Sequence, residues 1–275
     1  MIRINTETCI GCGLCAADCV AKYLKIVDGK AVTLPNYCIG CGHCYAICPT
    51  GSITLDNEFY KDSELNETED IRSFDPVSAD TLLYLFKSRR SVRRFTDQDV
   101  ESQKIRYLLD AVRYAPTGRN TQHTRITLIK DQLPELTQMS VNTLAQFAEQ
   151  LPENASEELT YMASLYKEGW KGMKRALDNK GKDLLFHHCN TLMIISAPDD
   201  VDGAIAASYA ELMCHSLGLG CVYIGFMKLA AEDPEIRKFL KLKKDYRIVC
   251  TLAIGYSAVT YRYTVPRKER KLTIL

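Results

Sequence analysis

The sequence has 275 residues, which is enough for one large domain or for a medium domain plus a small one. Hydrophobic residues make up 46% and charged residues 25%, and the formal net charge of +1 offers no broad basic field for nucleic acids or membranes. The first residues lack the apolar stretch of a signal peptide, and later apolar runs are too short to span a bilayer. We therefore expect a cytoplasmic protein with no nucleic-acid and no membrane partner.

Eight of the twelve cysteines lie between Cys9 and Cys48. Disulfide scaffolds spread their cysteines over the part they staple and are usually small and secreted, so this clustering favours metal binding. Two runs, residues 9–19 and 38–48, share the spacing C-x-x-C-x-x-C-x-x-x-C and both open with Cys-Ile-Gly-Cys-Gly. The runs form an internal repeat, and its glycines allow the backbone to fold tightly around a bound group.

This repeat resembles the bacterial-type ferredoxins that hold two [4Fe–4S] clusters, in which the fourth cysteine of each run ligates the other cluster. The resemblance implies one cluster on Cys9, Cys12, Cys15 and Cys48, and a second on Cys38, Cys41, Cys44 and Cys19. Val20 stands where the family usually has proline, which removes no ligand. A pair of structural zinc sites is the alternative, although zinc sites use two pairs of ligands rather than evenly spaced quartets. His43 is interpreted as a residue on the solvent side.

We expect a ferredoxin-type domain at residues 1–55, an acidic linker at 56–78 and a larger domain at 79–275. Part of the linker has a solvated helix as its alternative interpretation. In the larger domain, apolar periodicity predicts helices and strands in alternation. The expected helices are 78–87, 100–114, 132–150, 153–178 and 203–217, with Ser78 or Asp80 as the first cap. The expected strands are 125–130, 191–196 and 247–255.

Three motifs of the larger domain carry chemistry. Residues 87–95 place four arginines around a serine, which suits an anion because arginine offers a planar fork of donors; an exposed basic turn is an equal alternative. Residues 115–122 form a loop with uncharged hydrogen-bonding groups, which by itself is also typical of an ordinary loop. Residues 218–226 are glycine-rich and could bring backbone N–H groups close to a ligand, or could simply end a helix before a strand.

In this order, and with a basic tail after Gly255-Tyr256, these motifs resemble the FMN-dependent nitroreductase family over residues 80–275. The resemblance implies an α+β fold and a homodimer with FMN at its interface. His123-Thr124 replaces the Pro-Trp pair of many members, which leaves contacts beyond Gln122 open. The implied FMN-binding residues are Arg89, Arg90, Ser91, Arg93, Pro116, Thr117, Gly118, Asn120, Gln122, Tyr223, Ile224, Gly225, Arg267 and Arg270.

The resemblance also implies that residues 153–178 cover the substrate pocket. Their large side chains have spacing that suits a flavin face, but a core role explains them equally well: Tyr161, Met162, Tyr166, Trp170 and Met173. A trio of Glu157, Tyr161 and Lys182 loosely resembles the dehalogenase branch of the family. The remaining histidines and cysteines are interpreted as structural, and no catalytic acid or base is assigned: His187, His188, His215, Cys189, Cys214, Cys221 and Cys250.

Iron–sulfur clusters move single electrons, whereas a flavin can collect a pair. The sequence therefore predicts an oxidoreductase. Electrons would pass from an external one-electron donor, such as reduced ferredoxin, through two clusters to FMN and then to an electron-poor small molecule. A nitroaromatic, a quinone or an activated alkene fits that acceptor. The alternatives are a redox sensor or electron carrier without a small substrate, a reductive dehalogenase, and a domain that binds an anion other than FMN.

Overall fold

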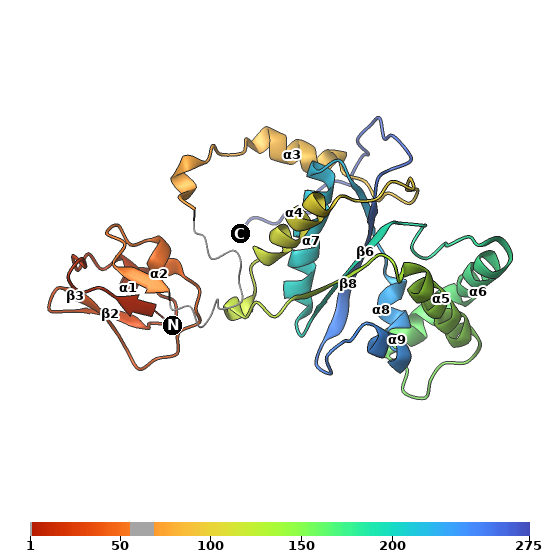
Figure 1. Ribbon diagram of the computed structural model, residues 1–275, viewed down its shortest axis with the longest axis horizontal. Helices are drawn as coiled ribbons and strands as arrows, with labels where there is room; N and C mark the ends of the chain where they lie inside the picture. The colour runs from red at the N-terminus through yellow and green to blue at the C-terminus, as the bar shows by residue number, and fades with distance from the viewer. Residues whose placement is uncertain (1, 56–68) are drawn as a thin grey trace. The chain divides into compact units, whose positions relative to one another are not determined.

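The computed structural model describes residues 2–55 and 69–275 (Figure 1). By their contacts the residues form two compact units, one comprising 1–76 with 117–121 and the other comprising 77–116 with 122–275. Most of the expected linker, residues 56–68, lies outside the described residues. Its described remainder contains one turn of 3-10 helix, η2 (Ile71–Ser73), which Asp70 caps by accepting a hydrogen bond from the Arg72 amide.

The first unit contains two small antiparallel sheets and two short helices. Strand β1 pairs with β4, and β2 pairs with β3 through a two-residue turn. Its buried apolar core is limited to Cys15, Leu24, Ala31 and Ile53, which is little for a unit of this size. The elements are β1 (Ile2–Ile4), α1 (Leu14–Asp18), β2 (Leu24–Val27), β3 (Lys30–Thr33), α2 (His43–Ala46) and β4 (Ile53–Leu55).

The internal repeat of the sequence is also a structural repeat. Helices α1 and α2 each follow a glycine in the left-handed region, Gly13 with φ of 80° and Gly42 with φ of 75°. Only glycine adopts this conformation at no steric cost, so the Cys-Ile-Gly-Cys-Gly sequence sets the same local turn twice.

The second unit is built on a four-stranded sheet in the order β5-β6-β8-β7, with every neighbouring pair antiparallel. An antiparallel sheet with helices confirms the α+β class that the resemblance implied. The strands are β5 (Arg125–Ile129), β6 (Thr191–Ala197), β7 (Gly220–Tyr223) and β8 (Arg247–Gly255).

Helices cover both faces of this sheet, as Figure 1 shows. Helices α4 and α7 pack on one face, and α5, α6, α8 and α9 on the other. All seven residues of β6 are buried because alternate side chains enter opposite cores, Leu192 and Ile194 one, Met193 and Ile195 the other. The helices are α4 (Ser102–Arg113), α5 (Leu133–Glu149), α6 (Glu157–Lys180), α7 (Asp200–Ser216), α8 (Phe226–Ala230) and α9 (Pro234–Phe239).

Helix caps decide where the predicted helices begin. The Ser78 side chain, rather than Asp80, accepts a hydrogen bond from the Thr81 amide and starts α3 (Ala79–Ser88). Asp199 accepts from the amides of Val201 and Asp202, so α7 starts at residue 200 rather than at 203. No helix among the described residues is long and apolar enough to cross a membrane.

Candidate functional site

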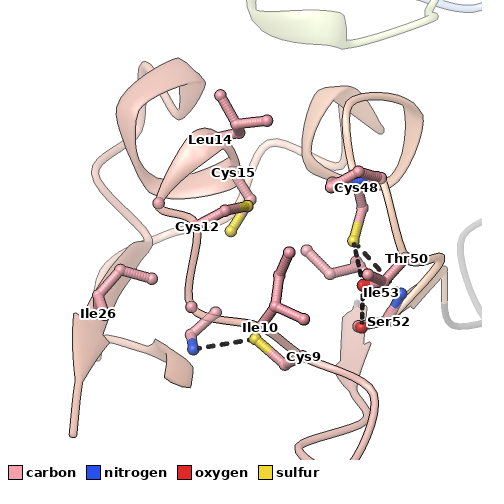
Figure 2. Close-up of a pocket in the computed structure, with 14 residues that line it drawn as sticks. Cys9, Ile10, Cys12, Leu14, Cys15, Ile26, Cys48, Thr50, Ser52 and Ile53 are labelled. Atoms are coloured by element: carbon pink, nitrogen blue, oxygen red, sulfur yellow. Dashed lines mark hydrogen bonds between the residues drawn. The ribbon is translucent and has the colours of Figure 1, made fainter. Parts of the chain in front are cut away.

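Four cysteines from both runs surround one pocket of the first unit. Figure 2 shows Cys9, Cys12 and Cys15 on one stretch of chain and Cys48 on another, all lining one pocket. Apolar side chains, among them Ile10, Leu14 and Ile26, complete its wall. The structure thus brings together the four residues predicted for the first cluster, while their ligation of iron stays a prediction.

Backbone N–H groups point at the sulfur atoms around this pocket. The Ala31 amide lies 3.4 Å from Cys9 Sγ, and the Ser52 amide lies 3.3 Å from Cys48 Sγ. Lys30 Nζ donates to the Cys9 carbonyl at 2.6 Å, which fastens strand β3 to the first run. Hydrogen bonds to sulfur stabilise the thiolate and are one way in which a protein sets the potential of a cluster. They come from β3 and from the turn before β4, which the cysteine spacing does not reveal.

The other four cysteines form a second group. Burial, followed by the neighbouring cysteines Cys38, Cys41 and Cys19, raises the pKa of the Cys44 thiol to about 11. The Tyr23 amide donates to Cys19 Sγ at 3.3 Å, and the Gly40 amide lies 3.5 Å from Cys38 Sγ. The fourth cysteine of each run therefore lies with the first three of the other, which is the interleaving that the ferredoxin resemblance implied.

The described residues do not support the zinc alternative. No group of three or more His, Cys, Asp or Glu among them is placed to hold a single metal ion. Zinc requires four ligand atoms within about 2.3 Å of one centre, whereas a [4Fe–4S] cube needs sulfurs at its corners, farther apart. His43 is largely exposed and pairs with Asp18 at 3.3 Å, which agrees with its assignment to the solvent side.

In the second unit, the arginine-rich segment follows α3 and contacts α7. Arg89 Nη1 lies 2.8 Å from Glu211 Oε1, and the two side chains are only 27% and 15% exposed. Arg90 Nη1 donates to the Arg89 carbonyl, but Arg90 Nη2 is buried and has no hydrogen-bond partner among the described residues. A buried guanidinium donor without a partner is costly, and a phosphate oxygen would satisfy it. The segment is thus suited to an anion, and its contact with the phosphate of FMN stays a prediction.

The glycine-rich segment lies directly beside the arginine-rich one. The Val92 amide donates to the Cys221 carbonyl at 2.9 Å, and Ser91 bridges to Cys221. A side chain on Gly220 would meet Val92 at 2.6 Å, so this glycine permits close packing between the two motifs. Gly218, with φ of +73°, ends α7. Gly218 and Gly220 are therefore explained by the end of a helix and the start of a strand, without a bound ligand.

The end of β7 holds the other residues predicted in this segment. The Ile224 amide donates to the Thr251 carbonyl at 2.8 Å, so its N–H group is already engaged. Tyr223 is partly exposed; burial raises the pKa of its hydroxyl, and the nearby Glu211 raises it further. Gly225 precedes α8, and nothing would obstruct a side chain there. The Ile224 amide is therefore unavailable to a ligand, whereas the Tyr223 side chain is accessible at this edge.

The predicted flavin loop, Pro116 to Gln122, is divided between the units. Residues 117–121 belong by their contacts to the first unit. There the Asn120 side-chain amide donates to the carbonyls of Ile39 and Gly40, at 3.2 and 3.0 Å. Asn120 and Gln122 have φ of 54° and 50°, unusual for residues other than glycine. Their placement along a flavin stays a prediction.

The C-terminal tail returns to the arginine-rich segment. The Ala258 amide donates to the Arg94 carbonyl at 2.9 Å, and the Tyr261 hydroxyl lies 3.3 Å from the Ser91 carbonyl. Arg267 and Arg270 follow in an exposed stretch without regular secondary structure. The start of the tail is thus fixed beside Ser91, and the role of its two arginines stays a prediction.

The aromatic residues of α6 divide between the core and solvent. Trp170 is fully buried and packs edge-on against Phe226 at 5.7 Å between ring centres, which favours its core interpretation. Tyr161 is 65% exposed. Glu157 begins α6 and Lys182 follows its end, so the 24-residue helix separates them by about 36 Å. The trio suggested for dehalogenation therefore does not assemble within one chain.

Three of the remaining cysteines are buried, which agrees with their interpretation as apolar core residues. The Asp183 amide donates to His188 Nε2 at 2.9 Å, and Cys189, Cys214 and Cys221 are buried. His215, however, contacts Ser88 Oγ at 2.8 Å beside the arginine-rich segment. Glu211 was not predicted from the sequence. The signal available was that Glu211 and His215 lie one turn apart on the same face of α7.

Comparison with known proteins relates each part of this chain to a family. The Nitroreductase family matches residues 86–256, and a 4Fe-4S dicluster domain matches residues 1–49. A curated Streptomyces coelicolor protein, which carries the name NADH dehydrogenase/NAD(P)H nitroreductase, is 33% identical over 72 residues. That match spans 26% of this chain and only 34% of the relative.

Solved structures share the fold of the second unit at low sequence identity. An FMN-bound nitroreductase from Bacteroides fragilis has a TM-score of 0.53 and 21% identity, over 70% of this chain and 98% of that one. One from Desulfitobacterium hafniense, also solved with FMN, has the same score and identity, over 70% and 97%. An FMN-dependent nitroreductase from Clostridium difficile has a TM-score of 0.52 and 21% identity, over 72% and 100%.

The family match covers more than half of the chain, and the antiparallel sheet with its two helical layers supports it independently. The chain therefore belongs to the nitroreductase family of oxidoreductases and carries a 4Fe-4S dicluster domain at its N-terminus.

Proposed function

We propose that this protein is an FMN-dependent oxidoreductase that takes electrons from an external low-potential donor through two [4Fe–4S] clusters. FMN would then pass them to an electron-poor small molecule such as a nitroaromatic, a quinone or an activated alkene. The observation that carries this proposal is the presence, in one chain, of two interleaved cysteine groups and a buried guanidinium donor that has no hydrogen-bond partner among the described residues. We expect the protein to act in the cytoplasm, where a reducing environment preserves thiolate ligands.

The cysteine groups support the cluster part of the proposal through their chemistry. Thiolates are the ligands of iron–sulfur clusters, and amides that donate to sulfur stabilise them. Burial opposes the loss of the Cys44 proton in the free protein, so metal binding must release that proton. When bound, the two clusters would supply one-electron transfer; the cysteines only hold them and set their potential.

The arginine-rich segment supports the flavin part. Arg90 would donate to the phosphate from Nη2, which has no hydrogen-bond partner among the described residues, with Arg89, Ser91 and Arg93 beside it. The other proposed contacts are Pro116, Thr117, Gly118, Asn120, Gln122, Tyr223, Ile224, Gly225, Arg267 and Arg270. FMN, when bound, supplies the exchange between single electrons and electron pairs. The task of these residues is to bind and orient it, and none of them is assigned as an acid or base.

A second copy of this chain would complete the flavin site. Helix α3 has no buried residue although Leu82, Leu83, Tyr84 and Phe86 lie on it, and all four are more than 40% exposed. The C-terminal tail adds Tyr263, Leu272 and Ile274, which are still more exposed. Such a concentration of exposed apolar side chains marks an interaction surface. We propose that two chains cover these surfaces mutually in a homodimer, with FMN at the interface.

Anaerobic turnover tests the proposal. Protein reduced by dithionite, and separately by reduced ferredoxin or NAD(P)H, is mixed with a panel of nitroaromatics, quinones, alkenes and halogenated aromatics, and the flavin absorbance is followed. The proposal expects at least one acceptor to reoxidise the flavin faster than oxygen alone does. If none does, the protein is a redox sensor or electron carrier. If only halogenated compounds do, it is a reductive dehalogenase, and an absorption spectrum without flavin bands points to another anion.

A further inference from the structure

Helix α7 presents two polar side chains to the segment that follows α3. Glu211 and His215 lie four residues apart, on the same face of the helix. Glu211 pairs with Arg89 at 2.8 Å, and His215 contacts Ser88 at 2.8 Å. Two consecutive residues at the start of the arginine-rich segment are thus held by two consecutive turns of one helix.

The ion pair is shielded from water. Arg89 is 27% exposed and Glu211 is 15% exposed, so the charges attract each other more strongly than a surface pair would. Burial, followed by the positive charges of Arg89 and Arg90, lowers the pKa of His215. The imidazole therefore stays neutral, and Glu211 is the negative charge that faces these two arginines from α7.

The ion pair leaves most of the Arg89 donors available. Arginine has five N–H donors in a rigid fork, and the contact with Glu211 joins one nitrogen to one carboxylate oxygen. A single contact fixes the plane of the guanidinium while other N–H groups can face an anion. Arg90 is oriented in its turn, because its Nη1 donates to the Arg89 carbonyl. Its Nη2 is buried and has no hydrogen-bond partner within the described part of the chain.

We propose that Glu211 is a positioning residue that orients the Arg89 guanidinium toward the phosphate of FMN and, through the Arg89 backbone, sets the edge that Arg90 offers. This inference rests on the proposed binding of FMN and assigns Glu211 no contact with the flavin itself. We expect its effect to depend on the phosphate, because the guanidinium fork pairs with phosphate oxygens.

Riboflavin provides the test, because it has the ring and the ribityl chain of FMN but no phosphate. The dissociation constants of FMN and riboflavin are measured by flavin fluorescence on flavin-free protein that retains its iron, kept anaerobic. Glu211→Gln preserves shape and removes the charge. We expect it to weaken FMN binding by about tenfold or more, as the loss of a charge-assisted contact would, and to change riboflavin binding less than about twofold.

A control substitution shows whether the effect depends on which carboxylate of α7 is removed. Asp200→Asn removes a carboxylate at the other end of α7, where Asp200 pairs with Arg247, and should leave both dissociation constants unchanged. If Glu211→Gln does not fold, Glu211→Asp carries the same test, since it keeps the charge but shortens the side chain that reaches Arg89 by one methylene. It should reduce the preference for FMN over riboflavin in the same way.

The outcomes separate this inference from the proposed function. If Glu211→Gln weakens FMN and riboflavin equally, or changes neither, the positioning role is overturned. If the unaltered protein binds FMN no more tightly than riboflavin, the phosphate site is overturned as well. If it binds neither flavin, the proposed function fails.

Discussion

Gly11 offers the sharpest test of how the first run wraps its cluster. A Cβ atom on Gly11 would lie 2.0 Å from the backbone oxygen of Gly29, in the turn between β2 and β3, and φ at Gly11 is +66°. An L-residue in this left-handed conformation costs about 1 kcal/mol. A backbone oxygen cannot rotate away, so the turn must shift and weaken the contacts of Lys30 and Ala31 with Cys9, at about 1 kcal/mol each.

We therefore expect Gly11→Ala to destabilise the cluster-binding unit by about 3 kcal/mol. For a unit of this size that is about 15 °C in the midpoint of thermal unfolding. The assay is the loss of visible cluster absorbance on anaerobic heating, together with iron and sulfide per chain in the purified protein.

Gly29→Ala is the matched control for this substitution. Gly29 also has a left-handed φ, +71°, but a Cβ atom there would meet nothing within 4 Å. It should therefore show only the backbone cost, about 5 °C. Should Gly11→Ala lower the midpoint by no more than Gly29→Ala does, the close contact between the first run and the turn does not support the cluster, and the reasoning is refuted.

Three further predictions concern the cysteine groups and the second unit. Cys48→Ser should abolish the electron paramagnetic resonance signal of one cluster and Cys19→Ser that of the other; loss of the same signal in both would contradict the interleaved groups. Gly220→Ala, which would meet Val92 at 2.6 Å, should lower the stability of the second unit by about 2 kcal/mol. Gly169→Ala, within α6 and unobstructed, should raise it by up to about 1 kcal/mol, and equal effects on unfolding would refute the packing argument. The guanidinium of Arg247 lowers the pKa of Asp200, so their ion pair stabilises the protein above the ordinary pKa of aspartate and is lost as the pH falls below it. Since both side chains are half exposed, the loss is under about 1 kcal/mol, and acid titration of Asp200→Asn should lack it.

Long elements with a sustained apolar period were predictable from the sequence. The strand expected at 247–255 has the bounds of β8, and β6 is one residue longer than the strand expected at 191–196. Both were predictable because their apolar side chains pack in the cores on the two faces of the sheet. Helices α8 and α9 were not predicted as elements, and strand β7 was given only as the alternative interpretation of residues 218–226. They have four to six residues each, too few to establish a period, and the packing around β8 defines them.

The site was predictable where spacing along the chain determines proximity. The cysteine runs are such a case, since three ligands of each group lie within seven residues of one another. Glu211 lies 122 residues from its partner Arg89, and the contact exists only because α7 packs against the end of α3. The contact of Asn120 with Ile39 and Gly40 could not be predicted either, because these residues lie about 80 positions away along the chain.

The central claim is that electrons reach FMN by way of the clusters. Stopped-flow mixing of the anaerobic protein with reduced ferredoxin measures this directly, by following cluster and flavin absorbance together. The comparison is a variant with Cys12→Ser and Cys41→Ser, which should lack both clusters and retain FMN. We expect flavin reduction in this variant to be at least about tenfold slower than in the unaltered protein. Equal rates of flavin reduction in the two proteins would contradict the account.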